Sequence, residues 1–166
     1  MSVDFFDANI FIYLFDETDA GKRRISENIL AEALIHDTGA ISFQVVQETL
    51  NVITTRLKVP ASTGDALQFL EKVLTPLWRI MPSRVLYSSA IAIQSRYRYS
   101  FYDALIIAAA LEAGCARLLT EDMQHGQKIE GLVIVNPFLE AVLSGDFASI
   151  VARNNSGVIS DVNVVR

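Results

Sequence analysis

The sequence predicts an α/β fold of three layers, α/β/α, in which helices cover both faces of a mostly parallel central sheet. Short apolar runs typical of buried strands alternate with longer segments of helical periodicity along the chain. Such alternation requires crossover connections between strands, and these place helices on both faces of a parallel sheet. The chain has 166 residues, of which 51% are hydrophobic, and this is enough for one buried core.

The first third of the chain contains two predicted strands and two predicted helical segments. Val3–Phe6 is a short apolar segment compatible with a buried strand. A helical or tightly turned segment follows at Ala8–Phe15, and residues 21–36 have apolar side chains at helical spacing. Gly39 then interrupts the pattern before a brief strand around Ala40–Ile41.

The middle of the chain is predicted to contain two helices and a strand. Ser42 is suited to cap the first helix, at about residues 43–58. The second helix opens at Ser62 and is expected to end near Pro76, because the residue before a proline is disfavoured in a helix. An apolar strand is predicted at Leu77–Met81.

The last third is predicted to contain two helices, two strands and a short final helix. In chain order these are residues 83–99, 101–114, Arg117–Thr120, Leu132–Val135 and 138–144. No repeat or linker divides the chain, so residues 1–144 are predicted to form one domain. Residues 145–166 contain Ser, Asn and Gly and are expected to form a loosely ordered tail.

Composition argues against a membrane protein or a secreted protein. The longest apolar run, Ala104–Leu111, is far shorter than the roughly 20 residues of a membrane helix. The N-terminal segment has acids at Asp4, Asp7 and Asp16 and no preceding positive region, so it does not resemble a signal peptide. The single cysteine, Cys115, cannot form an internal disulfide. We therefore expect a cytoplasmic protein without a membrane partner.

Four acidic residues stand where such a sheet binds ligands, which is outside the carboxyl ends of the strands. Asp7 ends the first predicted strand, and Asp122 follows the strand that ends at Thr120. Asp103 opens the apolar helix, and Glu48 lies in the second turn of the helix after the second strand. The sequence therefore predicts that these acids face one cleft.

Each acid also has a purely structural interpretation. Ser100 and Asp103 form a capping-box-like pattern at the start of a helix, and Asp7 is suited to cap the helix that follows it. Glu48 is able to pair with a base such as Arg56 or Arg98, and Asp122 is able to belong to a simple turn. Taken singly, each acid is explained by local structure.

Taken together, four gathered carboxylates would repel one another unless a cation lay between them. Mg²⁺ and similar hard cations prefer carboxylate and water oxygens, whereas zinc usually requires His or Cys ligands. The two histidines, His36 and His125, have no ligand spacing and are assigned to surface or loop positions. The acids therefore favour a magnesium-type site.

Four segments resemble, in this order, the PIN-domain family and, within it, the VapC-like toxins of toxin–antitoxin pairs: FFDANIFIY, SFQVVQETLNVI, SFYDALIIAAALEAGC and LLTEDMQHG with GLVIVNPF. The similarity extends from about residue 3 to residue 138. It implies a PIN fold and a metal-dependent endoribonuclease that uses one or two Mg²⁺ or Mn²⁺ ions. The catalytic metal ligands that it implies are Asp7, Glu48, Asp103 and Asp122, with Asn9 and Thr120 in support. It also implies an RNA substrate, a cognate antitoxin that occupies the site, and a homodimer.

The expected reaction is hydrolysis of an RNA phosphodiester by a water that the metal activates and orients. A net charge of −5 argues against a broad basic surface for nucleic acid, although Arg96 and Arg98 are able to hold flanking phosphates. The alternative is a catalytically silent PIN-like module that binds RNA or a protein. The spacing of Asp4 and Asp7 does not match the D-x-D motif of haloacid-dehalogenase-type phosphatases, and no Walker or G-x-G-x-x-G motif occurs.

Overall fold

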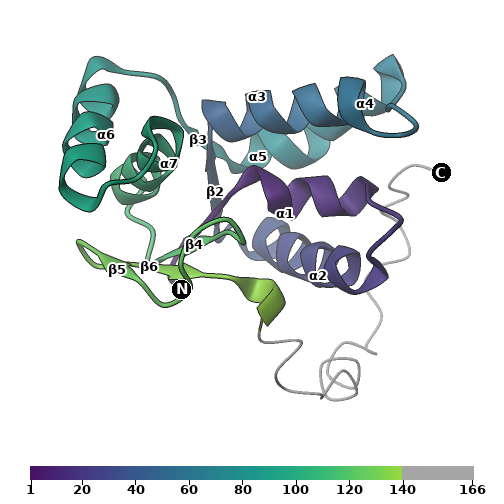
Figure 1. Cartoon of the computed structure of the whole chain (residues 1–166). Helices are drawn as coiled ribbons and strands as arrows, with labels where there is room; N and C mark the ends of the chain where they lie inside the picture. Colours follow the sequence, from purple (N-terminus) through teal and green to yellow (C-terminus); the bar gives the residue numbers. More distant parts are fainter. Residues whose placement is uncertain (140–166) are drawn as a thin grey trace.

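Six strands form one twisted sheet at the centre of the protein, shown in a computed structural model that describes residues 1–139 (Figure 1). The strands are β1 (Asp4–Phe6), β2 (Gly39–Ser42), β3 (Trp78–Ile80), β4 (Arg117–Leu119), β5 (Lys128–Ile129) and β6 (Leu132–Val135). Their order across the sheet is β3-β2-β1-β4-β6-β5. Every neighbouring pair is parallel except β5 and β6, which are antiparallel. The prediction of a mostly parallel sheet is confirmed.

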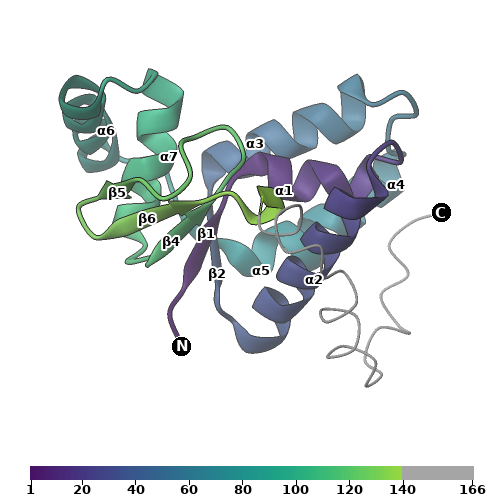
Figure 2. The same ribbon diagram turned by 60° about the horizontal axis from the view of Figure 1, so that its bottom comes forward.

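Helices cover both faces of this sheet. They are α1 (Ala8–Ile12), α2 (Ala20–His36), α3 (Phe43–Asn51), α4 (Thr63–Phe69), α5 (Thr75–Leu77), α6 (Arg84–Tyr97) and α7 (Phe101–Glu112). A 3₁₀ turn at Tyr13–Phe15 extends α1, and π-helical segments at Val52–Arg56 and Leu70–Leu74 extend α3 and α4. Figures 1 and 2 show α6 and α7 together on one side of the sheet, with α1 and α2 on the other. The three-layer architecture is therefore as predicted.

The apolar helix α7 forms much of the core on its side of the sheet. All seven residues from Ala104 to Ala110 are buried, so the helix is apolar around its whole circumference. It contacts both β2 and β4. Four of the seven are alanines, whose small side chains allow close approach to neighbouring elements. The helix therefore holds its first turn in a fixed position beside the carboxyl ends of the strands.

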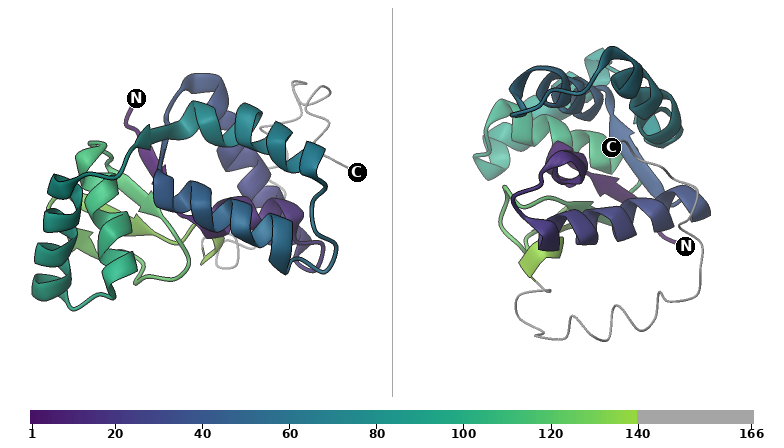
Figure 3. Two further views of the ribbon diagram at one scale, coloured as in Figure 1. Left: turned by 90° about the horizontal axis from the view of Figure 1, so that it is seen from above. Right: turned by 90° about the vertical axis from the view of Figure 1, so that its right-hand side faces the viewer.

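The middle of the chain forms a helical hairpin, in which α3 and its π segment lie beside α4, its π segment and α5 (Figure 3). The second arm ends at Leu77, near Pro76 as predicted, but it passes through the proline before it ends. A proline ring clashes with the carbonyl four residues earlier in a regular α-helix. Here the Thr75 N–H instead donates to the carbonyl of Leu70, and this wider π turn accommodates the proline.

Three smaller predictions also require correction. The strand β5 was not predicted, because two residues are too short to show alternation. Ser42 occupies the N-cap position of α3, but its side chain makes no capping hydrogen bond. A helical turn begins at Pro137, one residue earlier than predicted. The rest of the predicted helix 138–144, from residue 140, and the predicted tail 145–166 lie outside the described residues.

The histidines and the cysteine lie where the sequence placed them. His36 is exposed at the end of α2, and His125 is exposed in the loop between β4 and β5. Cys115 is buried, and burial raises the pKa of its thiol to about 11. Among residues 1–139, no helix combines the length and the apolar character that crossing a bilayer requires.

Candidate functional site

The site begins where the central strands β1 and β4 end. Phe6 and Leu119 are register partners in this parallel pair, so the residues that follow them, Asp7 and Thr120, emerge side by side. Thr120 Oγ1 donates a hydrogen bond to Asp7 Oδ2 over 2.7 Å. The chain passes from β1 to β2 on one side, while β4 lies on the other, so this edge is the topological switch point of the sheet.

Asp7 is a buried carboxylate, with only 8% of its surface exposed. It is the N-cap of α1, because its Oδ1 accepts a hydrogen bond from the Ala8 N–H over 2.7 Å. Burial raises the pKa of Asp7 to about 6, the bonds from Thr120 and Ala8 act in the opposite direction, and the carboxylates of Glu48 and Asp122 raise it further. Asp7 is therefore a helix cap, and it is also an acid whose charged form is disfavoured by burial and by two nearby carboxylates.

Asn9 and Thr120 join Asp122 to Asp7. Asn9 Nδ2 donates to Asp122 Oδ2 over 3.0 Å and to Thr120 Oγ1 over 3.3 Å. The backbone N–H of Asp122 also donates to Thr120 Oγ1, over 3.2 Å. One threonine hydroxyl thus connects both acids, and Asp122 lies in the turn that the structural interpretation proposed for it. The supporting positions that the sequence suggested for Asn9 and Thr120 match these contacts.

Glu48 reaches the site from the second turn of α3. Its side chain is exposed. It pairs with neither Arg56 nor Arg98, since its partner is Gln44, whose Nε2 donates to Glu48 Oε1 over 2.9 Å. Sequence reasoning missed Gln44, although its spacing of four residues from Glu48 on one helix is a usable signal.

Asp103 combines its capping role with a position beside Glu48. Its backbone N–H donates to Ser100 Oγ over 3.1 Å, and Ser100 Oγ donates to Asp103 Oδ2 over 2.7 Å. The capping pattern predicted at the start of α7 is confirmed. Gln44 Nε2 also approaches the carbonyl of Tyr102 over 3.4 Å, so one amide connects Glu48 to the residue before Asp103.

All four acids are bound by neutral donors. Within residues 1–139, none of them forms an ion pair with a lysine, arginine or histidine. In the same part of the chain, no three Asp, Glu, His or Cys side chains are gathered closely enough to hold a metal ion as they stand. Each carboxylate instead points toward its own hydroxyl, amide or backbone donor.

The donor set nevertheless fits a hard divalent cation. It consists of carboxylate oxygens, which Mg²⁺ and Mn²⁺ prefer, and it contains no sulfur or imidazole ligand. Asn9 Oδ1 is a further buried oxygen without a hydrogen-bond partner among the described residues. A cation here would offset the burial and the repulsion that raise the pKa of Asp7.

A second cluster, which the sequence did not reveal, supports the turn that carries Asp122. Lys22 Nζ lies 2.7 Å from Glu121 Oε2 and donates to the Tyr13 hydroxyl over 2.8 Å. Tyr13 in turn donates a short hydrogen bond to Glu121 Oε1. The hydrogen bonds that Lys22 donates to Glu121 and Tyr13 hold the pKa of Lys22 well above its usual range. This Lys22–Glu121–Tyr13 cluster neutralises the acid next to Asp122.

The two arginines suggested for phosphate binding lie at the end of α6. Both are exposed, and Arg98 is the C-cap residue in the left-handed conformation, at a φ of 60°. Arg96 lies 3.8 Å from Glu130 and over the ring of Tyr97, at 5.3 Å from its centroid. These are helix-end roles, and phosphate binding by either arginine stays a prediction.

A sequence model of the PIN domain matches residues 5–128. This range contains β2, β3, β4 and parts of β1 and β5, and all four acids with Asn9 and Thr120 lie within it. A search among curated protein sequences finds no match.

Solved structures share the fold at low sequence identity. A toxin–antitoxin complex from Klebsiella pneumoniae is 22% identical, with a TM-score of 0.57, and the match covers 81% of this chain and 97% of that one. VapBC2 from Rickettsia felis, bound to a DNA fragment from its promoter, is 17% identical, with a TM-score of 0.57 and coverage of 81% and 98%. VapC20 from Mycobacterium tuberculosis, a toxin that cleaves the sarcin–ricin loop, is 20% identical, with a TM-score of 0.51 and coverage of 69% and 86%.

Proposed function

The chain belongs to the PIN domain family, and from this premise we propose that it is a metal-dependent endoribonuclease, the toxin of a toxin–antitoxin pair. One observation carries the proposal. Asp7, Glu48, Asp103 and Asp122 come from four separate segments, and within residues 1–139 no cationic side chain neutralises them. Burial and the nearby carboxylates of Glu48 and Asp122 raise the pKa of Asp7, and a divalent cation bound by these acids would offset both effects. Structural neighbours described as toxin–antitoxin complexes support the biological role.

The four carboxylates would hold one or two Mg²⁺ or Mn²⁺ ions. When bound, such an ion activates a water for attack and offsets negative charge on the phosphate. Asp7 and Asp122 are held by one threonine hydroxyl, so their separation is fixed before the substrate arrives. Glu48 and Asp103 are contributed by α3 and α7. The phosphate would bind next to the cation that these acids hold.

The remaining parts of the proposal concern location and partners. An RNA substrate and a location in the cytoplasm follow from the proposed toxin role. A cognate antitoxin would occupy the acidic site and keep it from RNA, and the active form would be a homodimer. The acidic net charge of −5 favours a basic inhibitory segment on the antitoxin, because opposite charges attract over several ångströms.

The test compares two aspartates that occupy the same place in their helices. Asp103 and Asp65 are each three residues after a serine cap, and the backbone N–H of Asp65 donates to Ser62 Oγ over 3.1 Å, as that of Asp103 does to Ser100. Wild type, Asp103→Asn and Asp65→Asn would be incubated with mixed structured and single-stranded RNAs. Each reaction would contain Mg²⁺, Mn²⁺ or a chelator.

Metal-dependent cleavage by wild type and Asp65→Asn, with loss of cleavage in folded Asp103→Asn, supports the proposal. Cleavage that persists in the chelator would contradict the role of the metal. Equal cleavage by all three proteins would show that the four acids do not form the catalytic site. If wild type binds RNA and cuts none of it, the protein is the catalytically silent binding module.

A further inference from the structure

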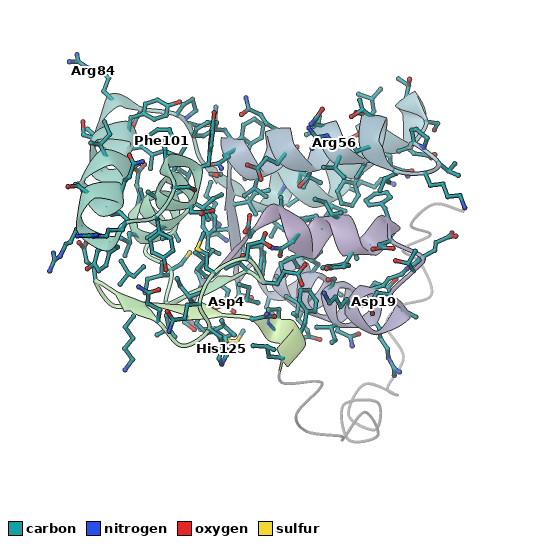
Figure 4. All side chains as sticks on the ribbon, viewed as in Figure 1. Asp4, Asp19, Arg56, Arg84, Phe101 and His125 are labelled. Atoms are coloured by element: carbon teal, nitrogen blue, oxygen red, sulfur yellow. The ribbon has the colours of Figure 1, made fainter. Side chains whose placement is uncertain are left out.

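Four aromatic side chains form a continuous run beside the acidic site: Phe43, Tyr87, Phe101 and Tyr102. The Phe43 and Tyr87 rings meet edge to face, with centroids 6.4 Å apart. Tyr87 stacks on Phe101, with an angle of 21° between the ring planes, and Phe101 meets Tyr102 edge to face at 5.7 Å. This aromatic run joins the first residues of α3 and α7 to the first half of α6. Figure 4 places Phe101 at the upper end of α7.

The aromatic run is connected to the acids by the chain and by hydrogen bonds. Tyr102 directly precedes Asp103, and its carbonyl accepts from the same Gln44 amide that binds Glu48. Phe43 begins the helix that carries Glu48. The aromatic run therefore adjoins the starts of the two helices that carry Glu48 and Asp103.

Two of the four aromatic side chains have a large fraction of their surface exposed to solvent. Tyr102 is 68% exposed and Tyr87 is 37% exposed, whereas Phe43 and Phe101 are half-buried beneath them. The hydroxyls of Tyr87 and Tyr102 make no hydrogen bond within residues 1–139. The half-buried rings fix the positions of the exposed ones, so the faces are available without a cost in reordering.

We infer that the aromatic run is a stacking platform, on which Tyr102 binds an unpaired base of the RNA next to the phosphate held by the acids. This inference rests on the proposed ribonuclease function and adds a base-binding side chain, Tyr102, to the acidic site. Bases in a duplex are stacked on one another, so only unpaired bases can stack on a protein ring. Every base has a π face, so such a ring is able to stack on any unpaired base.

Charge favours a nucleic acid on this surface. Arg84 lies three residues before Tyr87 on α6, so the two share a helix face, and Arg84 forms no ion pair within the described part of the chain. Figure 4 shows its side chain extending away from the protein. The platform thus has a cation at one end and the metal-binding acids at the other, which matches a base flanked by two phosphates. Stacking also supplies affinity that a protein with a net charge of −5 cannot gain from a broad basic surface.

The experiment measures RNA binding separately from RNA cleavage. Asp103→Asn protein, in which the RNA stays intact, would be titrated into a fluorescent single-stranded RNA of roughly 10 nucleotides that contains 2-aminopurine. The same strand in a duplex is the second probe. Tyr102→Ala and Tyr102→Phe would be added to this background, with Ile35→Ala as the control because Ile35 is similarly exposed, at 58%, on α2.

Stacking predicts about a tenfold loss of affinity for the single strand in Tyr102→Ala, with wild-type affinity in Tyr102→Phe and Ile35→Ala. The quenching of 2-aminopurine should disappear with the ring, and duplex binding should not change. The loss should be equal at low and high salt, whereas Arg84→Gln should reduce the salt slope by about one phosphate contact.

Unchanged affinity in Tyr102→Ala, or an equal loss in Tyr102→Phe, would overturn the platform. So would a change of oligomeric state in Tyr102→Ala with unchanged RNA affinity, which would assign the rings to a contact between copies. If the wild type cleaves RNA and the Tyr102→Ala variant binds RNA equally well, the stacking platform is refuted and the nuclease is not. If RNA binding depends on the Tyr102 ring but the wild type cleaves no RNA, the nuclease is refuted and the stacking platform is not.

Discussion

Thr120 donates a hydrogen bond to Asp7 Oδ2 over 2.7 Å, across 113 positions of the chain, and the same hydroxyl accepts from the backbone N–H of Asp122. Both Thr120 and Asp7 are buried. A buried carboxylate that loses a donor keeps the cost of its lost hydration. The Thr120 hydroxyl therefore has a role in stability and in the geometry of the site.

Replacing Thr120 by valine keeps the shape of the side chain but removes the hydroxyl that donates to Asp7. This should destabilise the protein by about 1–3 kcal/mol, because the buried carboxylate loses a hydrogen bond. The pKa of Asp7 should rise further, since the bond from Thr120 lowers it. Urea unfolding would give the first effect, and Mn²⁺ titration at neutral pH should show weaker binding. Thr120→Ser keeps the oxygen and should behave like wild type in both measurements. Equal losses in the two variants would assign the effect to packing.

The raised pKa of Asp7 also predicts how the metal-free protein responds to pH. Its folded pKa of about 6 lies above the ordinary value of 3.8, so the folded state binds more protons than the unfolded state between these values. The stability due to this group is therefore fully present below about pH 4 and is lost as pH rises through 6, by about 3 kcal/mol in all. Asp7→Asn should lack this loss.

The measurement is the free energy of unfolding in chelator, from pH 4 to pH 8, for wild type and Asp7→Asn. The difference between the two curves isolates Asp7 from the other carboxylates. A difference that stays constant with pH would show that Asp7 has an ordinary pKa in the metal-free protein. Excess Mn²⁺ should remove most of the difference at pH 8, because a bound cation stabilises the charged form.

The sequence was a good guide where a local pattern had one physical explanation. The cap at Ser100 and Asp103 and the strand ends at Asp7 and Thr120 were predicted from neighbouring residues alone. The site required only that parallel strands end at a common edge. The fold could be predicted for the same reason, since alternating strands and helices permit few topologies.

Contacts between distant segments could not be read in this way. The contact of Gln44 with Tyr102 and that of Lys22 with Glu121 could not be predicted, because the two residues of each pair are far apart in the sequence. Pro76 was read as a helix end because its effect on a regular α-helix is known, whereas a π turn depends on the packing of the whole hairpin. Three-dimensional neighbours, rather than propensity, decided each of these positions.

The Lys22–Glu121 pair should contribute more than an ordinary surface ion pair, because it shares a hydrogen-bond network with Tyr13. Both side chains are partly exposed, so we expect a coupling of about 1 kcal/mol from a double-mutant cycle with Lys22→Met and Glu121→Gln. Arg23 and Glu27 form a matched pair on the surface of α2, where about 0.3–0.5 kcal/mol is expected. Equal couplings would mean that the network adds nothing.

If the cluster acts only by neutralising Glu121, Lys22→Met should strengthen Mn²⁺ binding and weaken RNA binding, and Glu121→Gln should have the opposite effects. An unpaired Glu121 beside Asp122 adds a negative charge that attracts the cation and repels the phosphate. The two titrations would be done with each single variant. A Lys22→Met protein that loses metal affinity instead would show that the cluster positions the Asp122 turn.

The two roles of Asp103 can be separated with a pair of variants. Ser100→Ala removes the hydroxyl that caps α7 and binds Asp103 Oδ2, so it should cost about 1 kcal/mol of stability while the carboxylate remains. Asp103→Asn keeps a polar side chain of the same size and should keep most of the stability. It loses the charge, and cleavage should fall by at least a hundredfold, as expected when a metal ligand is lost.

Ser62→Ala at the equivalent cap of α4 supplies the control for the cap alone. It should match Ser100→Ala in stability and leave both metal binding and cleavage at the wild-type level. Thermal unfolding and RNA cleavage would be measured on all four proteins, wild type included. If Asp103→Asn unfolds as readily as Ser100→Ala and still cleaves RNA, then Asp103 is a helix cap and nothing more. The opposite pattern requires a carboxylate whose charge acts outside its own helix, as that of a metal ligand would.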